Sequence, residues 1–121
     1  MINAIKFASV PVSDQDRALE FYKDKLGFSV LTDQPLSDDQ RWIELGIDGA
    51  ETRLVLFTMA DHKDRIGTPQ HVTFACDSVE KTYQILSEKG VEFEGKPKQM
   101  PWGTFATFKD PDGNSFVLAT R

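Results

Sequence analysis

Histidine and cysteine, which serve enzymes as bases, nucleophiles and metal ligands, are scarce in this sequence. There are 2 histidines, His62 and His71, and 1 cysteine, Cys76. Cys76 falls on the apolar face of a predicted strand, which favours a small core residue over a nucleophile. His62 lies in a polar segment and is expected to be solvated. The chain has no G-x-S-x-G, P-loop or G-x-G-x-x-G motif, so none of these signatures supports a catalytic or nucleotide-binding assignment.

A second set of candidates shares one face of the predicted strands. Successive side chains of a strand point to opposite faces, so alternation along the sequence separates them. One face is uniformly apolar, as expected beneath a helix. The opposite face is mixed and carries Trp42, Glu44, Arg53, His71 and Thr73. A concave face with a few polar groups among apolar ones is typical of small-molecule sites. An ordinary solvated sheet face is the alternative.

Four more residues are candidates for contact with a ligand. Phe7 and Phe57 fall on the mixed face by the same alternation. Arg41, like Arg53, is available to meet an anion. Trp102 lies in the loop Pro101-Trp102-Gly103, where an exposed indole is costly, so we expect it to cover the cavity or a partner subunit. The alternative is a surface tryptophan packed on its own hairpin.

The elements that position these residues occur twice in the same order. The first half predicts a strand over 4–12, a helix that begins at Ser13 or Asp14 and ends at Gly27, and strands over 28–33, 41–47 and 52–58. A polar loop over 59–69 follows. The second half predicts a strand over 71–77, a helix over 78–90, and strands over 91–93, 104–109 and 115–119. An offset of 63 residues places Asp14 on Asp77 and Gly27 on Gly90. The pattern indicates a repeated β-α-β-β-β order, although coincidence would also explain it because identity between the halves is poor.

The segment "DPDGN", Asp110 to Asn114, is a dense turn signal between two strand-like stretches. Pro111 fixes φ near the value that a turn needs, and Gly113 allows a positive φ. The sequence therefore predicts a hairpin close to the C-terminal end of the chain.

Two segments together resemble the vicinal oxygen chelate superfamily, which includes glyoxalase I, fosfomycin- and bleomycin-resistance proteins and extradiol dioxygenases. They are "VPVSDQDRALEFYKDKLGF" (residues 10–28) and "PWGTFATFKDPDGNSFVL" (residues 101–118). The resemblance covers essentially the whole chain and is specific to the fold, not to one activity. It implies an α+β fold of paired βαβββ modules, about 1–60 and 68–121 of a single domain 1–121, with curved mixed sheets around a cavity. It also implies a homodimer.

The resemblance also assigns the metal-ligand positions of the family's metalloenzymes, which hold a divalent ion with four side chains. These positions fall on Phe7, Val55, His71 and Val117. Three of the four offer no ligand atom, and one imidazole does not hold a labile divalent ion. Glu44 could approach His71, but two ligands fall short of the three that catalytic sites usually keep. We therefore expect no metal and no other cofactor.

Two function classes follow. The first is metal-independent small-molecule binding, like that of the drug-sequestering members of the family. The second is a metal-dependent lyase or isomerase of the glyoxalase I (lactoylglutathione lyase) type. The number of available ligands favours the first. A third reading, an enzyme that uses Glu44 as a general base without metal, requires a raised pKa for Glu44.

Composition restricts the partners and the compartment. The 121 residues carry 14 Lys+Arg against 19 Asp+Glu, a formal net charge of −5, which argues against nucleic acid or an anionic membrane as a partner. One cysteine allows no internal disulfide and indicates a reducing compartment. No apolar run approaches the length of a membrane span or of a secretion signal, so we expect a cytoplasmic protein.

Overall fold

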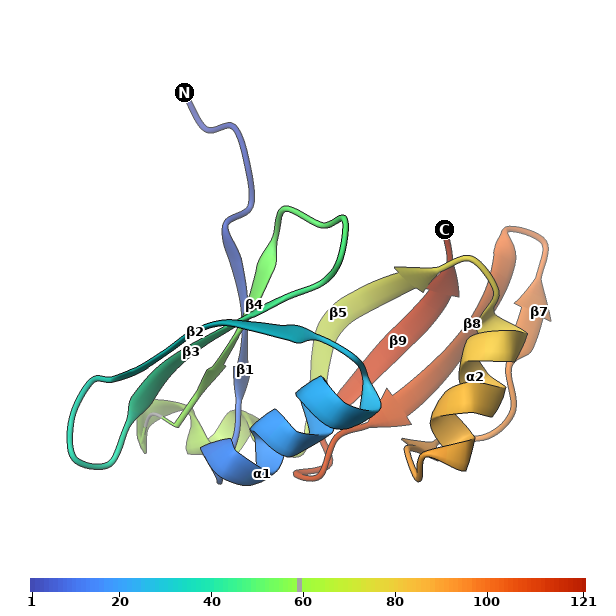
Figure 1. Ribbon diagram of the computed structural model, residues 1–121. Coiled ribbons are helices and arrows are strands. Elements are labelled where there is room, and N and C mark those ends of the chain that lie inside the picture. Colours follow the sequence, from blue (N-terminus) through green and yellow to red (C-terminus); the bar gives the residue numbers. More distant parts are fainter. Residues whose placement is uncertain (59) are drawn as a thin grey trace. The chain divides into compact units, whose positions relative to one another are not determined.

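The computed structural model describes residues 1–58 and 60–121. Within them the chain forms two compact units, Met1–Ile66 and Gly67–Arg121, each a mixed β-sheet with few helices (Figure 1). This confirms the predicted α+β class.

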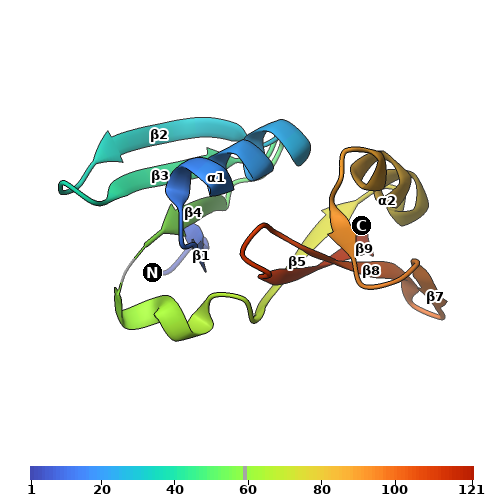
Figure 2. The same ribbon diagram turned by 90° about the horizontal axis from the view of Figure 1, so that it is seen from below.

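The first unit is a four-stranded sheet with a helix on one face. Its strand order is β1 (Phe7–Pro11), β4 (Arg53–Phe57), β3 (Arg41–Gly46) and β2 (Ser29–Pro35). Strands β1 and β4 are parallel, and the other neighbours are antiparallel. The helix α1 (Gln15–Glu20) continues into a π-helical segment, η1 (Phe21–Lys25), and lies against the sheet (Figure 2).

The sequence explains where this helix begins and what it buries. The side chain of Asp14 accepts a hydrogen bond from the backbone N–H of Arg17 at 3.1 Å, which satisfies one of the free N–H groups of the first turn. Gly27 follows the helix with φ of 80°, a value that glycine adopts without steric cost. The helix buries Ala18, Phe21 and Tyr22. Of the sheet residues that alternation places on the helix side, Ala8 is half-buried. The others are buried: Val10, Val12, Ile43, Leu45, Leu54 and Leu56. The predicted apolar face is therefore confirmed in this unit.

The segment predicted as a polar loop over 59–69 contains a helical turn. The 3₁₀ helix η2 spans Ala60–Arg65, and Met59 lies outside the described residues. His62, expected to be solvated, is half-buried, and its ring meets the edge of Phe57 at a centroid distance of 5.2 Å. This expectation was wrong because the short helix turns the imidazole toward the sheet.

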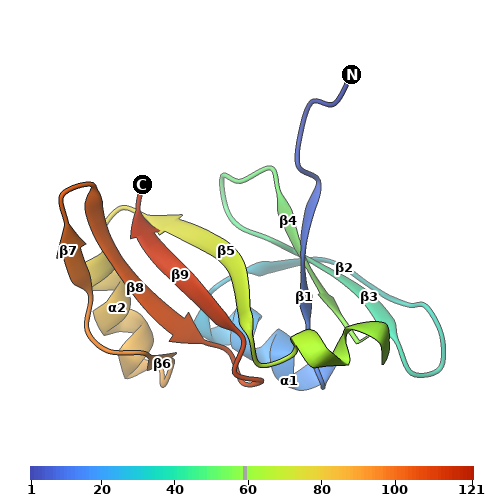
Figure 3. The same cartoon turned by 180° about the vertical axis from the view of Figure 1, so that it is seen from behind.

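The second unit is a five-stranded sheet. Its path is β5 (Pro69–Cys76), β9 (Ser115–Thr120), β8 (Gly103–Lys109) and β6 (Glu92–Phe93), and β7 (Lys98–Met100) pairs with β8 (Figure 3). The helix α2 spans Val79–Glu88 and is capped by Ser78, whose hydroxyl accepts a hydrogen bond from Lys81 N–H at 3.2 Å. The cap is therefore not Asp77, the residue that the 63-residue offset aligned with Asp14. Strand β7 was not predicted.

The hairpin predicted at Asp110–Asn114 joins β8 and β9, which are antiparallel. Gly113 has the expected positive φ of 83°. The Asp110 carboxylate accepts hydrogen bonds from the backbone N–H of Asp112 and of Asn114, both at 2.9 Å, and from Asn114 Nδ2 at 2.8 Å. Asn114, 0% exposed, also accepts bonds from Gly67 N–H at 2.8 Å and Gln70 Nε2 at 3.1 Å. The turn thus anchors the start of β5 as well as closing the hairpin.

Candidate functional site

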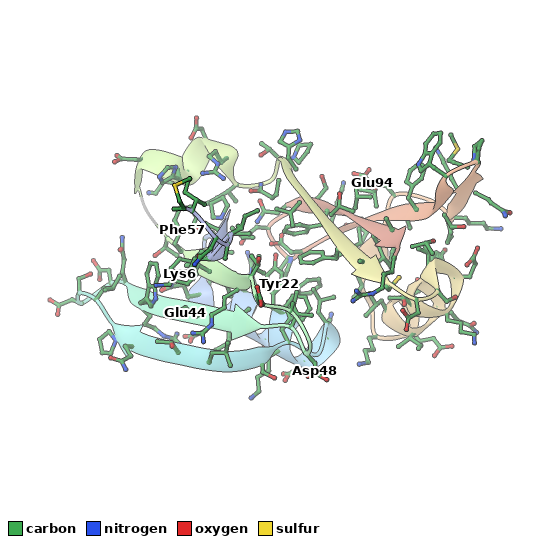
Figure 4. The ribbon with its side chains drawn as sticks, turned by 90° about the horizontal axis from the view of Figure 1, so that it is seen from above. Lys6, Tyr22, Glu44, Asp48, Phe57 and Glu94 are labelled. Carbon is green, nitrogen blue, oxygen red and sulfur yellow. The ribbon has the colours of Figure 1, made fainter. Side chains whose placement is uncertain are left out.

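Five predicted site residues lie on the face of the first sheet opposite α1. Trp42 and Glu44 come from β3, Arg53 and Phe57 from β4, and Phe7 from β1. The register pairs Phe7 with Arg53 and Glu44 with Val55, so residues distant in sequence become neighbours. Figure 4 shows Glu44 and Phe57, with Lys6 beside them, in this part of the first unit. The alternation of side chains along the strands correctly grouped these residues.

Glu44 is the polar centre of this face. Its Oε2 accepts a hydrogen bond from the indole Nε1 of Trp42 at 2.6 Å, and its Oε1 accepts one from Arg53 Nη1 at 2.8 Å. The Glu44 side chain is 12% exposed, against 46% for Arg53. The hydrogen bond from Trp42, then that from Arg53, and the positive charges of Arg53 and Lys6 lower the pKa of Glu44 below its ordinary value. A general base at neutral pH needs the opposite shift, so this carboxylate is suited to holding its neighbours in place.

The aromatic side chains form an apolar surface around that centre. Phe7 meets Trp42 edge to face, with ring centroids 5.7 Å apart and an interplanar angle of 75°. Val55, beside Glu44 in the register, is only 1% exposed. The bond to Glu44 holds the indole of Trp42 in one orientation beside the Phe7 ring.

Arg41 does not lie on this face. The prediction that placed it among the anion-binding residues of the site is corrected accordingly. Its guanidinium forms two hydrogen bonds with Asp33, Nε–Oδ1 at 3.0 Å and Nη2–Oδ2 at 2.7 Å, and a third with Asp16 of α1. This pairing lowers the pKa of Asp33, chiefly through the hydrogen bond. The side chain of Gln15 donates to the carbonyls of Arg41 and Leu56 at 2.7 and 3.1 Å. Arg41 therefore helps to attach the helix to the sheet, on the other face.

Leu31 joins the candidate site although no sequence argument selected it. The β2–β3 register shifts between Val30 and Thr32, so Leu31 is the extra residue of a β-bulge. A Cβ atom on Gly46 would lie 2.7 Å from Leu31 Cδ1, so the leucine covers the bare backbone of Gly46. By alternation Gly46 shares the face of Trp42 and Glu44. The glycine within a predicted strand was the available signal, because it often marks a bulge or a close approach.

Phe57 also lines a pocket of about 380 Å³ at the end of β1 and β4. The pocket residues are Pro11, Val12, Ser13, Phe57, Thr58, Lys63 and Ile66. The hydroxyl of Thr58 is buried there without a hydrogen-bond partner in the described part of the chain. The first unit therefore offers a concavity next to the aromatic surface.

The remaining predicted site residues belong to the second unit. His71 and Thr73 are exposed on β5, and the backbone of His71 has a positive φ of 57° where the β5–β9 register shifts between Pro69 and Thr73. Such a backbone is uncommon outside glycine, although histidine is among the residues that adopt it more often. Trp102 is 77% exposed between β7 and β8, and Val117 pairs with Thr73. The indole is thus not packed on its own hairpin.

The residues at the family's metal positions do not suit a metal ion. Phe7, Val55 and Val117 have no donor atom, and His71 is the one candidate ligand of the four. Over residues 1–58 and 60–121, no three side chains of His, Cys, Asp or Glu come together in a group that could hold a metal ion.

The fold and this face define a class: an α+β protein of two similar sheet units, of which the first carries an aromatic surface around a hydrogen-bonded carboxylate. The profile of the Glyoxalase/Bleomycin resistance protein/Dioxygenase superfamily matches residues 4–118, and the chain belongs to this superfamily. No helix among the described residues is long and apolar enough to cross a membrane.

Three relatives illustrate the similarity. The chain is 42% identical over 118 residues to the uncharacterized protein YetH of Bacillus subtilis (strain 168), with 98% of each chain covered. The crystal structure of TnmS3, an antibiotic binding protein from Streptomyces sp. CB03234, matches with a TM-score of 0.86 and 38% identity, covering 98% of this chain and 96% of that one. A superfamily member from Sphaerobacter thermophilus DSM 20745 matches with a TM-score of 0.88 and 32% identity, covering 99% and 98%.

Proposed function

We propose that this protein binds a small, partly apolar molecule without a metal, over the face of the first sheet that carries Phe7, Trp42 and Phe57. The observation that carries the proposal is the Trp42–Glu44–Arg53 arrangement, in which a charge-assisted hydrogen bond fixes an indole beside a second aromatic ring. Burial of an apolar ligand on such a surface contributes roughly 25 cal/mol per Å² of apolar area. The similarity to TnmS3, described as an antibiotic binding protein, supports the same class of function.

The rival reading is a metal-dependent lyase or isomerase of the glyoxalase I type. Its chemistry needs a metal that polarises a carbonyl, and the donor-free residues Phe7, Val55 and Val117 argue against it. The third reading, an enzyme that uses Glu44 as a general base without metal, is disfavoured by the lowered pKa of Glu44. We therefore place binding ahead of catalysis.

Elemental analysis separates the two readings. Purified without a His-tag, the protein should contain no stoichiometric Zn, Ni, Fe or Mn. It should not turn over the hemithioacetal of methylglyoxal and glutathione when Ni or Zn is added. About one metal ion per chain that is lost in His71→Ala, or metal-dependent turnover above background, would instead establish the rival.

The binding site itself is tested with ligands and tryptophan fluorescence. A thermal-shift screen of small apolar molecules should give stabilising compounds, and these should change the fluorescence of Trp42. Trp42→Phe should weaken their binding, because phenylalanine cannot donate the hydrogen bond to Glu44. Trp102→Phe tests whether the second unit contributes through its exposed indole, and His71→Ala and Thr73→Ala test β5. A ligand could bind Trp42→Phe with full affinity and leave the fluorescence of Trp42 in the wild-type protein unchanged. Such a result would place the site elsewhere.

We propose further that the protein acts as a cytoplasmic homodimer with no nucleic-acid or membrane partner. The net charge of −5 and the single cysteine support the compartment and the absence of polyanionic partners. Fractionation of cells that express the protein at its natural level tests the location.

A further inference from the structure

The candidate face carries more positive than negative charge. Arg53 pairs with Phe7 in the β1–β4 register, and its backbone N–H donates to the carbonyl of Lys6 at 3.0 Å. The Lys6 ammonium lies 5.2 Å from the centroid of the Phe7 ring. Glu44 is the carboxylate that both cations influence. These three groups therefore leave an excess of one positive charge beside the Phe7–Trp42 surface.

Each oxygen of the Glu44 carboxylate has a hydrogen-bond partner, whereas most donors of the two cations have none among the described residues. Both oxygens of Glu44 already accept hydrogen bonds, one from Trp42 and one from Arg53. Arg53 uses Nη1 for Glu44, and a guanidinium has five N–H donors in total. Its remaining donors have no hydrogen-bond partner among the residues that the structure describes, and its side chain is 46% exposed. Lys6 makes no ion pair with any of those residues either.

We propose that Arg53 and Lys6 form a subsite for the anionic group of a ligand whose apolar ring lies on Trp42 and Phe7. The inference rests on the proposed function and names its ligand class: an organic anion with a ring-sized apolar body, the anion being a carboxylate, sulfonate or phosphate. A planar guanidinium with free donors matches the oxygen pairs of such groups. The apolar body displaces water from the face, and this strengthens the interaction between the charges.

Two dyes of nearly equal shape test the subsite. 1-Anilinonaphthalene-8-sulfonate carries a sulfonate, and N-phenyl-1-naphthylamine is the same ring system without it. Fluorescence titrations should show one site per chain for both dyes, with the sulfonate binding about tenfold more tightly. Added salt should weaken binding of the sulfonate and leave binding of the neutral dye nearly unchanged.

Substitutions then assign the difference to residues. Arg53→Gln should weaken sulfonate binding about tenfold and Lys6→Gln about threefold, with little effect on the neutral dye. Glu44→Gln should strengthen sulfonate binding several-fold, because it removes the negative charge and releases Arg53. Arg53→Gln removes the cation but also leaves Glu44 without its ion-pair partner. The double variant Glu44→Gln/Arg53→Gln has no carboxylate at position 44, so it separates these two effects. It should bind the sulfonate more weakly than Glu44→Gln alone. Lys23→Gln, an exposed lysine of η1, is the matched control and should change neither dye.

The outcomes distinguish this inference from the proposed function. If Trp42→Ala weakens both dyes but Arg53→Gln and Lys6→Gln affect the two dyes equally, the binding surface stands and the subsite is wrong. Equal affinity of the wild-type protein for both dyes also overturns the subsite. If neither dye binds, or if Trp42→Ala changes neither, the proposed function fails and the subsite fails with it.

Discussion

At the scale of single residues, Glu44 is a titratable side chain whose carboxylate holds its neighbours in place and is not suited to act as a base. From the sequence, Glu44 was a carboxylate on the mixed face of the sheet, and one interpretation gave it the role of a general base. In the structure both of its oxygens accept hydrogen bonds, from an indole and from a guanidinium. Such partners stabilise the charged form and lower the pKa. The consequence is a dependence of stability on pH that a solvated glutamate would not give.

We predict that Glu44→Gln makes the protein less stable at neutral pH and less sensitive to acid. The pKa of Glu44 is lower in the folded than in the unfolded state, so its contribution is complete above the unfolded value. That contribution decreases below about pH 5 and is lost once the pH falls through the folded value. Urea unfolding across this range should therefore show wild type and Glu44→Gln converging as the pH falls.

The exposed Glu51 provides the control for that experiment. Glu51→Gln should leave both the free energy of unfolding and its pH dependence close to wild type. A stability difference between Glu44→Gln and wild type that stays constant down to low pH would contradict the prediction, since it would mean that packing and not charge is lost.

Residue positions were predicted more reliably than residue partners. Alternation along two strands is enough to place Trp42, Glu44 and Arg53 on one face. It does not show that the indole of Trp42 donates to Glu44, because that bond depends on two side-chain rotamers. Arg41 was misplaced because it was grouped with Arg53 by charge, although its neighbour Trp42 must point to the opposite face. Charge shows what a residue could bind, and the register shows where it lies.

At the scale of elements, the turn at Asp110–Asn114 does more than its sequence indicates. Its turn-forming residues correctly predicted the hairpin. The bonds from Gly67 and Gln70 to Asn114 could not be predicted, because they join segments 47 and 44 residues apart. The β-bulge at Leu31 was missed for a related reason. An extra residue in one strand is defined only by its pairing with the other strand.

The buried amide of this turn supports a stability prediction. Asn114→Ala should lower the free energy of unfolding by about 2–4 kcal/mol, because it leaves Asp110 Oδ2 and the Gly67 N–H without the partners they have in the buried turn. Urea denaturation at neutral pH measures the change. Pro111→Ala, at an exposed position of the same turn, should cost less than about 1 kcal/mol. Equal losses in the two variants would show that the turn conformation matters and the buried amide does not.

At the scale of the whole chain, the two units share their order of elements but differ in detail. The first helix is capped by Asp14 and ends in a π-helical segment, whereas the second is capped by Ser78 and does not. The strand after the first helix has seven residues, and the one after the second has two. Period and capping signals were strong enough to predict the repeated order. They were too weak to predict β7, because three exposed residues leave no apolar pattern.

The last prediction is that the protein is a homodimer. In the first unit β1 and β2 are the outer strands, and each pairs with one neighbour only among the described pairings. Val30, Leu31 and Leu36, in and next to β2, are 38%, 48% and 58% exposed. Open edges and exposed apolar side chains favour association, and most such assemblies are symmetric pairs.

Light scattering coupled to size exclusion decides the oligomeric state. At micromolar concentration the mass should be twice the chain mass of 13.6 kDa. It should not fall when salt is raised, because apolar burial, unlike ion pairing between exposed charges, is not screened. Leu36→Asp and Leu31→Asp place a charge among the exposed apolar side chains near β2, and Ile85→Asp places one at an exposed position of α2. If the β2 region forms the interface, the first two variants should dissociate more readily on dilution than the third. A mass near 13.6 kDa for the wild-type protein would show that the chain is monomeric and that its open edges are tolerated in solution.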